Sequence, residues 1–181
     1  MNYQGTQQLA HPAEKVWAAL LDPVVLRQCI AGCEKFERAV TEDGADTEAL
    51  NYNCTVKVAI GPVSARFTST LNLIDVVAPT SCTLQFSGQG GVAGFGKGEA
   101  KVVLVPQDGG ASTQLDWQAE SQVGGKLAQM GSRLIDAAVR KMSDDFFQRF
   151  AAQLNGPAEE TAPDAEGADP EAKKSIWSWK K

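Results

Sequence analysis

Residues 123–136, VGGKLAQMGSRLID, decide how the rest of this 181-residue chain is interpreted. Before them, residues 33–122 largely alternate apolar and polar side chains, which is the pattern of strands with one buried face. After them, apolar residues recur at steps of three and four as far as Leu154, which is the pattern of an amphipathic helix. The sequence therefore predicts a β-sheet followed by one long helix, continuous from about Lys126 to Leu154.

A strand and two short helices precede the sheet. Residues 2–10 are predicted as the strand. Pro12 suits the first turn of a helix over residues 14–21, because its missing N–H would be unpaired there. A second short helix starts at Pro23 and ends at Gly32. The order strand, two helices, six strands, long helix predicts an α+β helix-grip fold, in which a curved antiparallel sheet wraps around the C-terminal helix.

The glycine-rich residues 88–98 superficially resemble a phosphate-binding loop. Such a loop needs a strand before it and a helix N-terminus after it. Here a strand follows, so these glycines predict a tight, strongly curved hairpin or bulge instead.

Composition excludes several classes of protein. The net charge of −5 argues against nucleic acid as a partner. The chain lacks a run of ~18 apolar residues that would span a membrane, and its first residues lack the apolar segment of a signal peptide. We therefore expect a cytoplasmic protein with free thiols. The four cysteines are Cys29, Cys33, Cys54 and Cys82.

Metal binding and catalysis are not expected. A Cys29–Cys33 metal pair is conceivable, but structural zinc wants four ligands and the single histidine, His11, is far away in sequence. Buried small hydrophobic residues are the better interpretation of these cysteines. The inward positions of the strands are apolar or carry hydroxyls, with no ionisable pair to tune for acid–base chemistry. No catalytic residue is assigned.

The inward side chains of sheet and helix allow two interpretations, an ordinary core or the wall of an apolar cavity. Small residues such as Gly98, Ala100 and Ser132 favour the cavity because they leave room. Gly131 inside a helix costs about 1 kcal/mol against alanine, so a packing or access reason is expected. The helix from Leu127 to Met142 would form one wall. The candidate ligand-binding residues are Phe67, Leu71, Phe86, Trp117, Leu127, Met130, Gly131 and Leu134.

The composition changes after the long helix. Residues 1–154 are expected to form the ligand-binding domain. Residues 155–171 are rich in Pro, Ala, Glu and Asp, with no large apolar side chain, and are expected to be a disordered acidic tether. Residues 172–181 carry four lysines and no acidic residue, and form a basic tip.

The basic tip suits a membrane interface. Its two tryptophans favour the lipid headgroup layer, and each lysine near anionic lipid contributes ~1 kcal/mol. Docking on a protein partner and the absence of any role are the alternatives. The predicted membrane-binding residues are Lys173, Lys174, Ile176, Trp177, Trp179, Lys180 and Lys181.

Several motifs within about residues 1–154 resemble those of a known family, the G-type accessory subunits of carbon monoxide dehydrogenase. Residues 123–135 are the most specific of them. Most members have proline where Ala31 stands, a departure that affects a turn. The residues that carry the resemblance are Pro12, Glu14, Val16, Trp17, Leu20, Asp22-Pro23, 29–34 (CIAGCE), Gly61-Pro62-Val63, Phe67 and 123–135 (VGGKLAQMGSRLI).

The resemblance implies a START-like domain of the polyketide cyclase and lipid-transfer superfamily. It implies a non-enzymatic accessory protein that recruits a molybdenum hydroxylase of the carbon monoxide dehydrogenase type to anionic lipids on the cytoplasmic face of the inner membrane. A cavity combined with a membrane tip also fits an apolar ligand, with a respiratory quinone (menaquinone or ubiquinone) as the hypothesis. Two alternatives stay open: a recruitment or assembly factor with a solid core, and a small-molecule cyclase or hydrolase of the same fold.

Overall fold

The computed structural model describes residues 1–40 and 50–156. The basic tip lies outside the described residues, as does the expected acidic tether from residue 157 onward.

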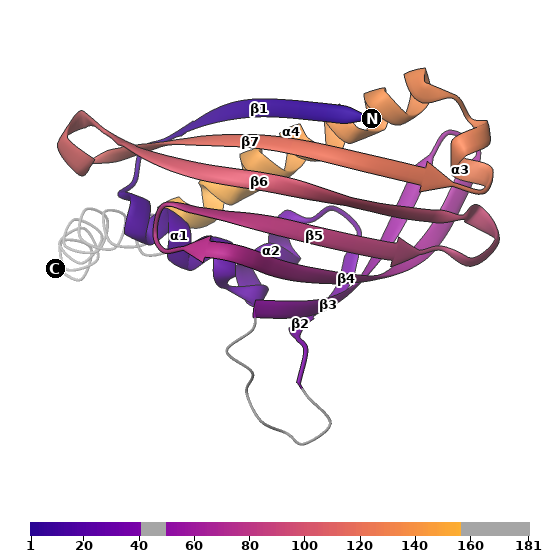
Figure 1. The fold of residues 1–181 in the computed structure, drawn as a ribbon, viewed down its shortest axis with the longest axis horizontal. Coiled ribbons are helices and arrows are strands. Elements are labelled where there is room, and N and C mark those ends of the chain that lie inside the picture. Colours follow the sequence, from indigo (N-terminus) through magenta and orange to yellow (C-terminus); the bar gives the residue numbers. More distant parts are fainter. Residues whose placement is uncertain (41–49, 157–181) are drawn as a thin grey trace, which may run out of the picture.

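One antiparallel sheet is the main layer of the described chain (Figure 1). Its strand order is β1-β7-β6-β5-β4-β3-β2. The first two helices carry the chain from one edge of the sheet to the other, so β1 pairs with β7 while β2 begins the opposite edge. The strands are β1 Asn2–Leu9, β2 Cys33–Arg38, β3 Leu50–Ile60, β4 Val63–Val77, β5 Ser81–Gln89, β6 Phe95–Gln107 and β7 Ser112–Gly124.

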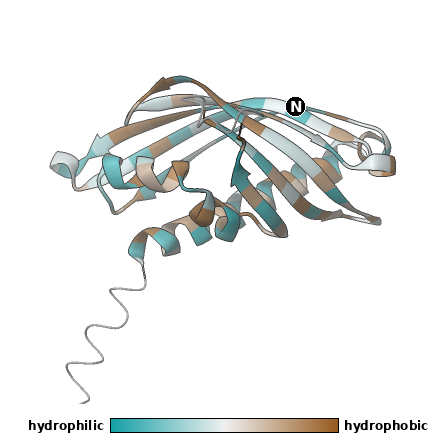
Figure 2. Cartoon of the chain, turned by 90° about the horizontal axis from the view of Figure 1, so that it is seen from below, coloured by the Kyte–Doolittle hydropathy of each residue, from teal (hydrophilic) through white to brown (hydrophobic). Residues whose placement is uncertain are grey.

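The helices lie on one side of the sheet. Seen from below, the curved sheet arches over them, with apolar and polar segments alternating along its strands (Figure 2). The Asp22 carboxylate accepts a hydrogen bond of 2.8 Å from Val24 N and so caps the second helix. The helices are α1 Ala13–Leu21, α2 Pro23–Cys29, α3 Lys126–Gln129 and α4 Ser132–Asn155, with short 3₁₀ turns η1 Gly91–Ala93 and η2 Asp108–Gly110. The predicted helix-grip α+β fold is confirmed.

The prediction of one continuous C-terminal helix was wrong. Gly131 has φ 86° and ψ 153°, a conformation that only glycine adopts readily. It separates the single turn of α3 from α4, whose 24 residues span about 36 Å. The break also rotates the buried face, since Ile135 is buried whereas Leu134 is 47% exposed.

The glycine-rich residues form the predicted tight hairpin between β5 and β6. Gly94 has φ 109°, and a Cβ there would collide with the Gly124 carbonyl oxygen. Glycine is therefore required where this hairpin packs against the end of β7. The contact holds the η1 turn against α3.

Three clusters of buried side chains surround the helix-facing side of the sheet. The largest joins α1 and the end of α4 to the sheet, the second lies under β2 and β3, and the third lies beside α3. The members of the three clusters are, in this order, Leu9, Val16, Trp17, Cys29, Cys82, Leu104, Leu115, Phe150 and Leu154; Phe36, Tyr52, Cys54 and Val56; and Phe67, Ala93 and Leu127.

Candidate ligand cavity

A cavity of about 480 Å³ lies between the sheet and the helices. Its volume is within the range of pockets that bind small molecules. Most of its lining is apolar and comes from three sources: α1 and α2, strands β4 to β7, and the middle of α4. The main apolar lining residues are Leu20, Leu21, Leu26, Ile30, Leu71, Leu73, Leu84, Phe86, Val102, Trp117, Val139, Met142, Phe146 and Phe147.

Small side chains in the centre of the sheet make room for this cavity. Ala100 and Ala119 are register partners on β6 and β7, and both line the cavity. Leu84 is the partner of Ala100 on β5. One inward position further along, the Phe86 ring lies against Gly98, where a Cβ would come within 2.7 Å of the ring. The sheet is thus thin where the helix approaches, as the small residues of the sequence had indicated.

Trp117 forms the side of the cavity between β1 and α4. Its indole lies over Gly5, its register partner, where a Cβ would be 2.7 Å from Nε1. The indole stacks on Phe147 with ring centroids 6.2 Å apart and an interplanar angle of 25°. Nε1 is buried and has no hydrogen-bond partner among the described residues.

The polar groups that line the cavity are few, and two of them already bind protein atoms. The Tyr3 hydroxyl donates to Asp136 Oδ1 at 2.8 Å and so joins β1 to α4. Burial and this hydrogen bond raise the pKa of Tyr3 to about 12. The Tyr52 hydroxyl donates to the Leu21 carbonyl at 2.9 Å, and burial raises its pKa as well. Both phenols are therefore neutral at physiological pH, and the site favours an uncharged, mainly apolar molecule.

Nucleophilic or acid–base chemistry has little to work with in this cavity. Among the described residues, the lining includes no Asp, Glu or His. Burial raises the pKa of the Cys82 thiol, so this lining residue is protonated and a poor nucleophile. No group of three His, Cys, Asp or Glu side chains within residues 1–40 and 50–156 is arranged to hold a metal ion.

The structure brings only three of the eight candidate residues into the lining. Leu71, Phe86 and Trp117 line the cavity. Phe67 and Leu127 are instead buried in the cluster beside α3. The remaining three also lie at that end of the sheet: Met130 packs on the cluster, Gly131 breaks the helix and Leu134 is partly exposed.

The helical wall is also displaced from the expected one. The sequence analysis placed it from Leu127 to Met142, whereas the lining on α4 runs from Val139 to Phe147. The missed residues had a signal, because they repeat at helical steps of three and one. The lining residues of α4 are Val139, Met142, Ser143, Phe146 and Phe147.

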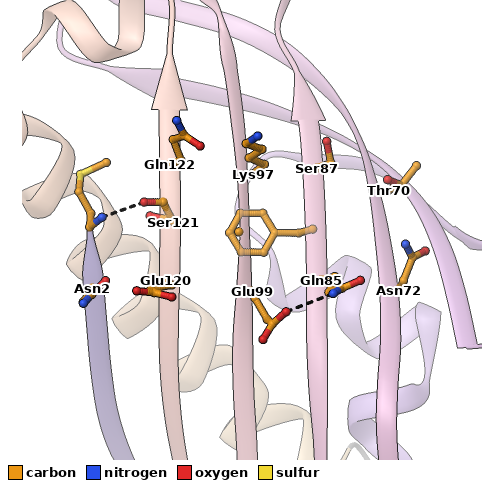
Figure 3. A pocket seen from close by; sticks show the side chains of 13 residues that line it. Asn2, Thr70, Asn72, Gln85, Ser87, Lys97, Glu99, Glu120, Ser121 and Gln122 are labelled. Atoms are coloured by element: carbon orange, nitrogen blue, oxygen red, sulfur yellow. Dashed lines mark hydrogen bonds between the residues drawn. The ribbon is translucent and has the colours of Figure 1, made fainter.

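A second hollow is open and polar. It measures about 550 Å³ and is lined mainly by the strand positions that alternate with the cavity residues (Figure 3). Gln85 donates to Glu99 across it at 3.1 Å. The N-terminal amino group of Met1 donates to the Ser121 carbonyl at its edge, at 2.8 Å. Its carboxylates and amides suit contact with water, so the apolar cavity remains the candidate ligand site.

No helix in the described part of the chain is long and apolar enough to cross a membrane.

Solved structures with the same fold cover most of this chain. A conserved protein from Geobacillus kaustophilus is 28% identical, with a TM-score of 0.75 over 86% of this chain and 95% of its own. A START superfamily protein from Mycobacterium smegmatis is 15% identical, with a TM-score of 0.62 over 85% and 97%. The Zhui aromatase/cyclase from Streptomyces sp. R1128 is 14% identical, with a TM-score of 0.62 over 86% and 93%. The last two similarities concern the fold alone.

No curated protein matches the sequence. The family of G-type carbon monoxide dehydrogenase subunits (CoxG) matches residues 5–155. The match covers nearly all of the described fold, including the cavity and both ends of the sheet. The chain therefore belongs to the CoxG family, with the START-like helix-grip fold that its sequence predicted.

Proposed function

We propose that this protein is a non-enzymatic accessory protein that binds an apolar ligand, a respiratory quinone, in the helix-grip cavity. It couples a molybdenum-containing dehydrogenase of the carbon monoxide dehydrogenase type to the cytoplasmic face of the inner membrane. The observation that carries the proposal is the apolar cavity of about 480 Å³ between the sheet and α4. The CoxG family name supports the dehydrogenase as partner.

The lining supports binding rather than turnover. A quinone ring is flat, uncharged and mostly apolar, and the stacked Trp117 and Phe147 rings offer it an aromatic surface. Menaquinone and ubiquinone both meet these requirements. A cyclase or hydrolase would need acid–base groups, and the described lining has no carboxylate or imidazole to supply them.

The basic tip completes the proposal as a reversible anchor on anionic lipid, with the acidic residues before it as a tether. Both lie outside the described residues from 157 on, so this part rests on the sequence. Lysines and indoles bind the interface weakly and reversibly when no lipid chain or spanning helix accompanies them.

The first experiment compares bound lipids in three full-length proteins purified from a quinone-containing bacterial host. Wild type is compared with Ala100→Leu/Ala119→Leu, which fills the cavity from two register partners. The matched control is Lys101→Leu/Gln118→Leu, which adds the same side chains to the adjacent register pair, where both residues are exposed. Extraction and mass spectrometry then measure quinone per protein.

We expect near-stoichiometric quinone in wild type and control, and a loss of at least tenfold in the filled variant. Protein without quinone in all three would overturn the carrier role and leave recruitment as the function. Equal quinone in all three would show that the lipid binds elsewhere.

A further inference from the structure

One end of the domain differs in composition from the rest of the chain. The turn between β3 and β4, the η1 hairpin, α3 and the first turn of α4 meet there, at the right of Figure 1. We call it the α3 end and define it as residues 60–64, 88–97 and 123–135. These segments hold Lys97, Lys126 and Arg133 and no acidic residue. The whole chain, in contrast, has 22 acidic and 17 basic residues.

Large apolar side chains are exposed at the same end. Val92 is 85% exposed, while its neighbour Ala93 is buried against the third core cluster. Leu134 is 47% exposed. Val92 belongs to η1, which packs against α3, and Leu134 follows α3 directly in the chain.

The turn between β3 and β4 extends this apolar surface. A Cβ at Gly61 would lie 2.9 Å from Met130 Cε and 3.9 Å from Leu134 Cδ1. Gly61 and Pro62 are themselves exposed. The α3 end thus presents an apolar centre made of three separate chain segments.

The basic side chains of the α3 end carry positive charge toward solvent. Lys97, Lys126 and Arg133 are exposed. Within residues 1–40 and 50–156, the salt bridges join other residues and involve none of these three. An exposed apolar surface flanked by uncompensated positive charge matches the interface of an anionic bilayer, where apolar side chains enter the headgroup layer and cations meet lipid phosphate.

The cavity reaches the same end. Gly96 and Val123 are register partners at the start of β6 and the end of β7, and both line the cavity. A membrane on the α3 end would therefore lie beside the part of the cavity farthest from α1.

We propose that the α3 end is a membrane-contacting surface of the folded domain, specific for anionic lipid and independent of the basic tip. It rests on the proposed function in one respect, since a cavity beside the bilayer has a purpose when the ligand is lipid-soluble. Because α4 separates this end from residue 156 by about 36 Å, a bilayer touching both surfaces requires a span of that order. Sixteen residues reach at most ~55 Å when extended, so one bilayer is within reach of both.

The test is flotation and titration of the full chain with phosphatidylcholine vesicles, prepared with and without about 30% anionic phosphatidylglycerol. Every protein carries Trp177→Ser/Trp179→Ser, which removes the indoles of the tip. On this background, Val92→Ser/Leu134→Ser removes the apolar centre, and Lys126→Gln/Arg133→Gln removes two positive charges. The matched controls alter exposed residues elsewhere: Val24→Ser/Val77→Ser and Lys15→Gln/Lys101→Gln.

We expect the background protein to bind anionic vesicles and to bind neutral ones at least tenfold more weakly. Removing each basic residue should weaken binding about fivefold, so the charge variant should lose roughly 25-fold. The apolar variant should lose at least tenfold, and both controls less than twofold. Hydrogen exchange of the full chain should slow in residues 60–64, 88–97 and 123–135 when anionic vesicles are added.

Three outcomes would overturn the proposal. The first is a background protein that no longer binds anionic vesicles, and the second is binding by the α3-end variants equal to that of the controls. The third is unchanged vesicle binding with loss of the co-purifying dehydrogenase, which would make this end a protein interface. Quinone content is measured separately, so a quinone-free protein whose binding still depends on the α3 end would overturn the carrier role alone.

Discussion

Gly5 decides where the Trp117 indole can lie. The two residues are register partners, and a Cβ at Gly5 would come within 2.7 Å of the indole nitrogen. Gly5→Ala should push the indole toward Phe147 and destabilise the protein by about 1–3 kcal/mol, as overpacking does. Gly96→Ala is the control, since its nearest neighbour is 3.9 Å away, and it should be neutral or stabilising by about 0.4–1 kcal/mol. Urea unfolding measures both, and equal effects would contradict the role given to Gly5.

Tyr3 is the second residue whose contribution has a definite sign. Tyr3→Phe removes the hydrogen bond to Asp136 and should cost about 1–2 kcal/mol at pH 8. Burial and this hydrogen bond raise the pKa of the phenol from 10.0 to about 12 in the folded protein. Between these pH values only the unfolded chain has lost the proton, so the wild-type advantage is complete below pH 10 and shrinks above it.

Urea unfolding of wild type and Tyr3→Phe at a series of pH values from about 8 to about 11 measures this difference. Other titrating groups are common to both proteins, so the difference isolates the phenol. An advantage that grew with pH would show that the hydrogen bond to Asp136 does not form.

At the scale of elements, strand alternation predicted which face each residue occupies but not its position along the cavity. Leu71, Phe86 and Trp117 lie near the middle of the sheet and line the cavity. Phe67 has the same inward orientation but lies toward the turn between β3 and β4, where the η1 hairpin covers it. Alternation is a local property, whereas the hairpin comes from a segment more than twenty residues away, so the pattern alone did not separate core from cavity.

The break between α3 and α4 gives the sharpest test at this scale. In a continuous helix, Gly131→Ala would stabilise by about 1 kcal/mol. With φ 86° and ψ 153° the same change should destabilise by about 1–3 kcal/mol, even though no atom lies within 4 Å of the added Cβ. Thermal and urea unfolding decide the sign. Ala137→Gly, at an exposed position inside α4, is the control and should cost about 1 kcal/mol.

At the scale of the whole molecule, the helix-grip order could be predicted because turns, prolines and periodicity each mark their own segment. The position of the cavity could not, because it depends on how α1, α2 and α4 converge on the sheet. The lining from α1 and the end of α2, such as Leu21 and Ile30, was missed for this reason. These residues looked like the apolar faces of two short helices, and only the packing of α2 against α4 brings them to the cavity.

Ligand binding should therefore stabilise the whole fold, and the cysteines offer a direct readout. Cys29, Cys54 and Cys82 are buried, and burial raises the pKa of Cys29 and Cys54 to about 11. Their reaction with Ellman's reagent at about pH 8 requires the protein to open. A ligand at about 100 times its dissociation constant adds about 2.7 kcal/mol to the free energy of unfolding. Decylubiquinone at that excess should slow modification of the buried thiols by up to about 100-fold, whereas the partly exposed Cys33 should react first and almost unchanged. The Ala100→Leu/Ala119→Leu variant should show no slowing, and the same protection in that variant would place the quinone outside the cavity.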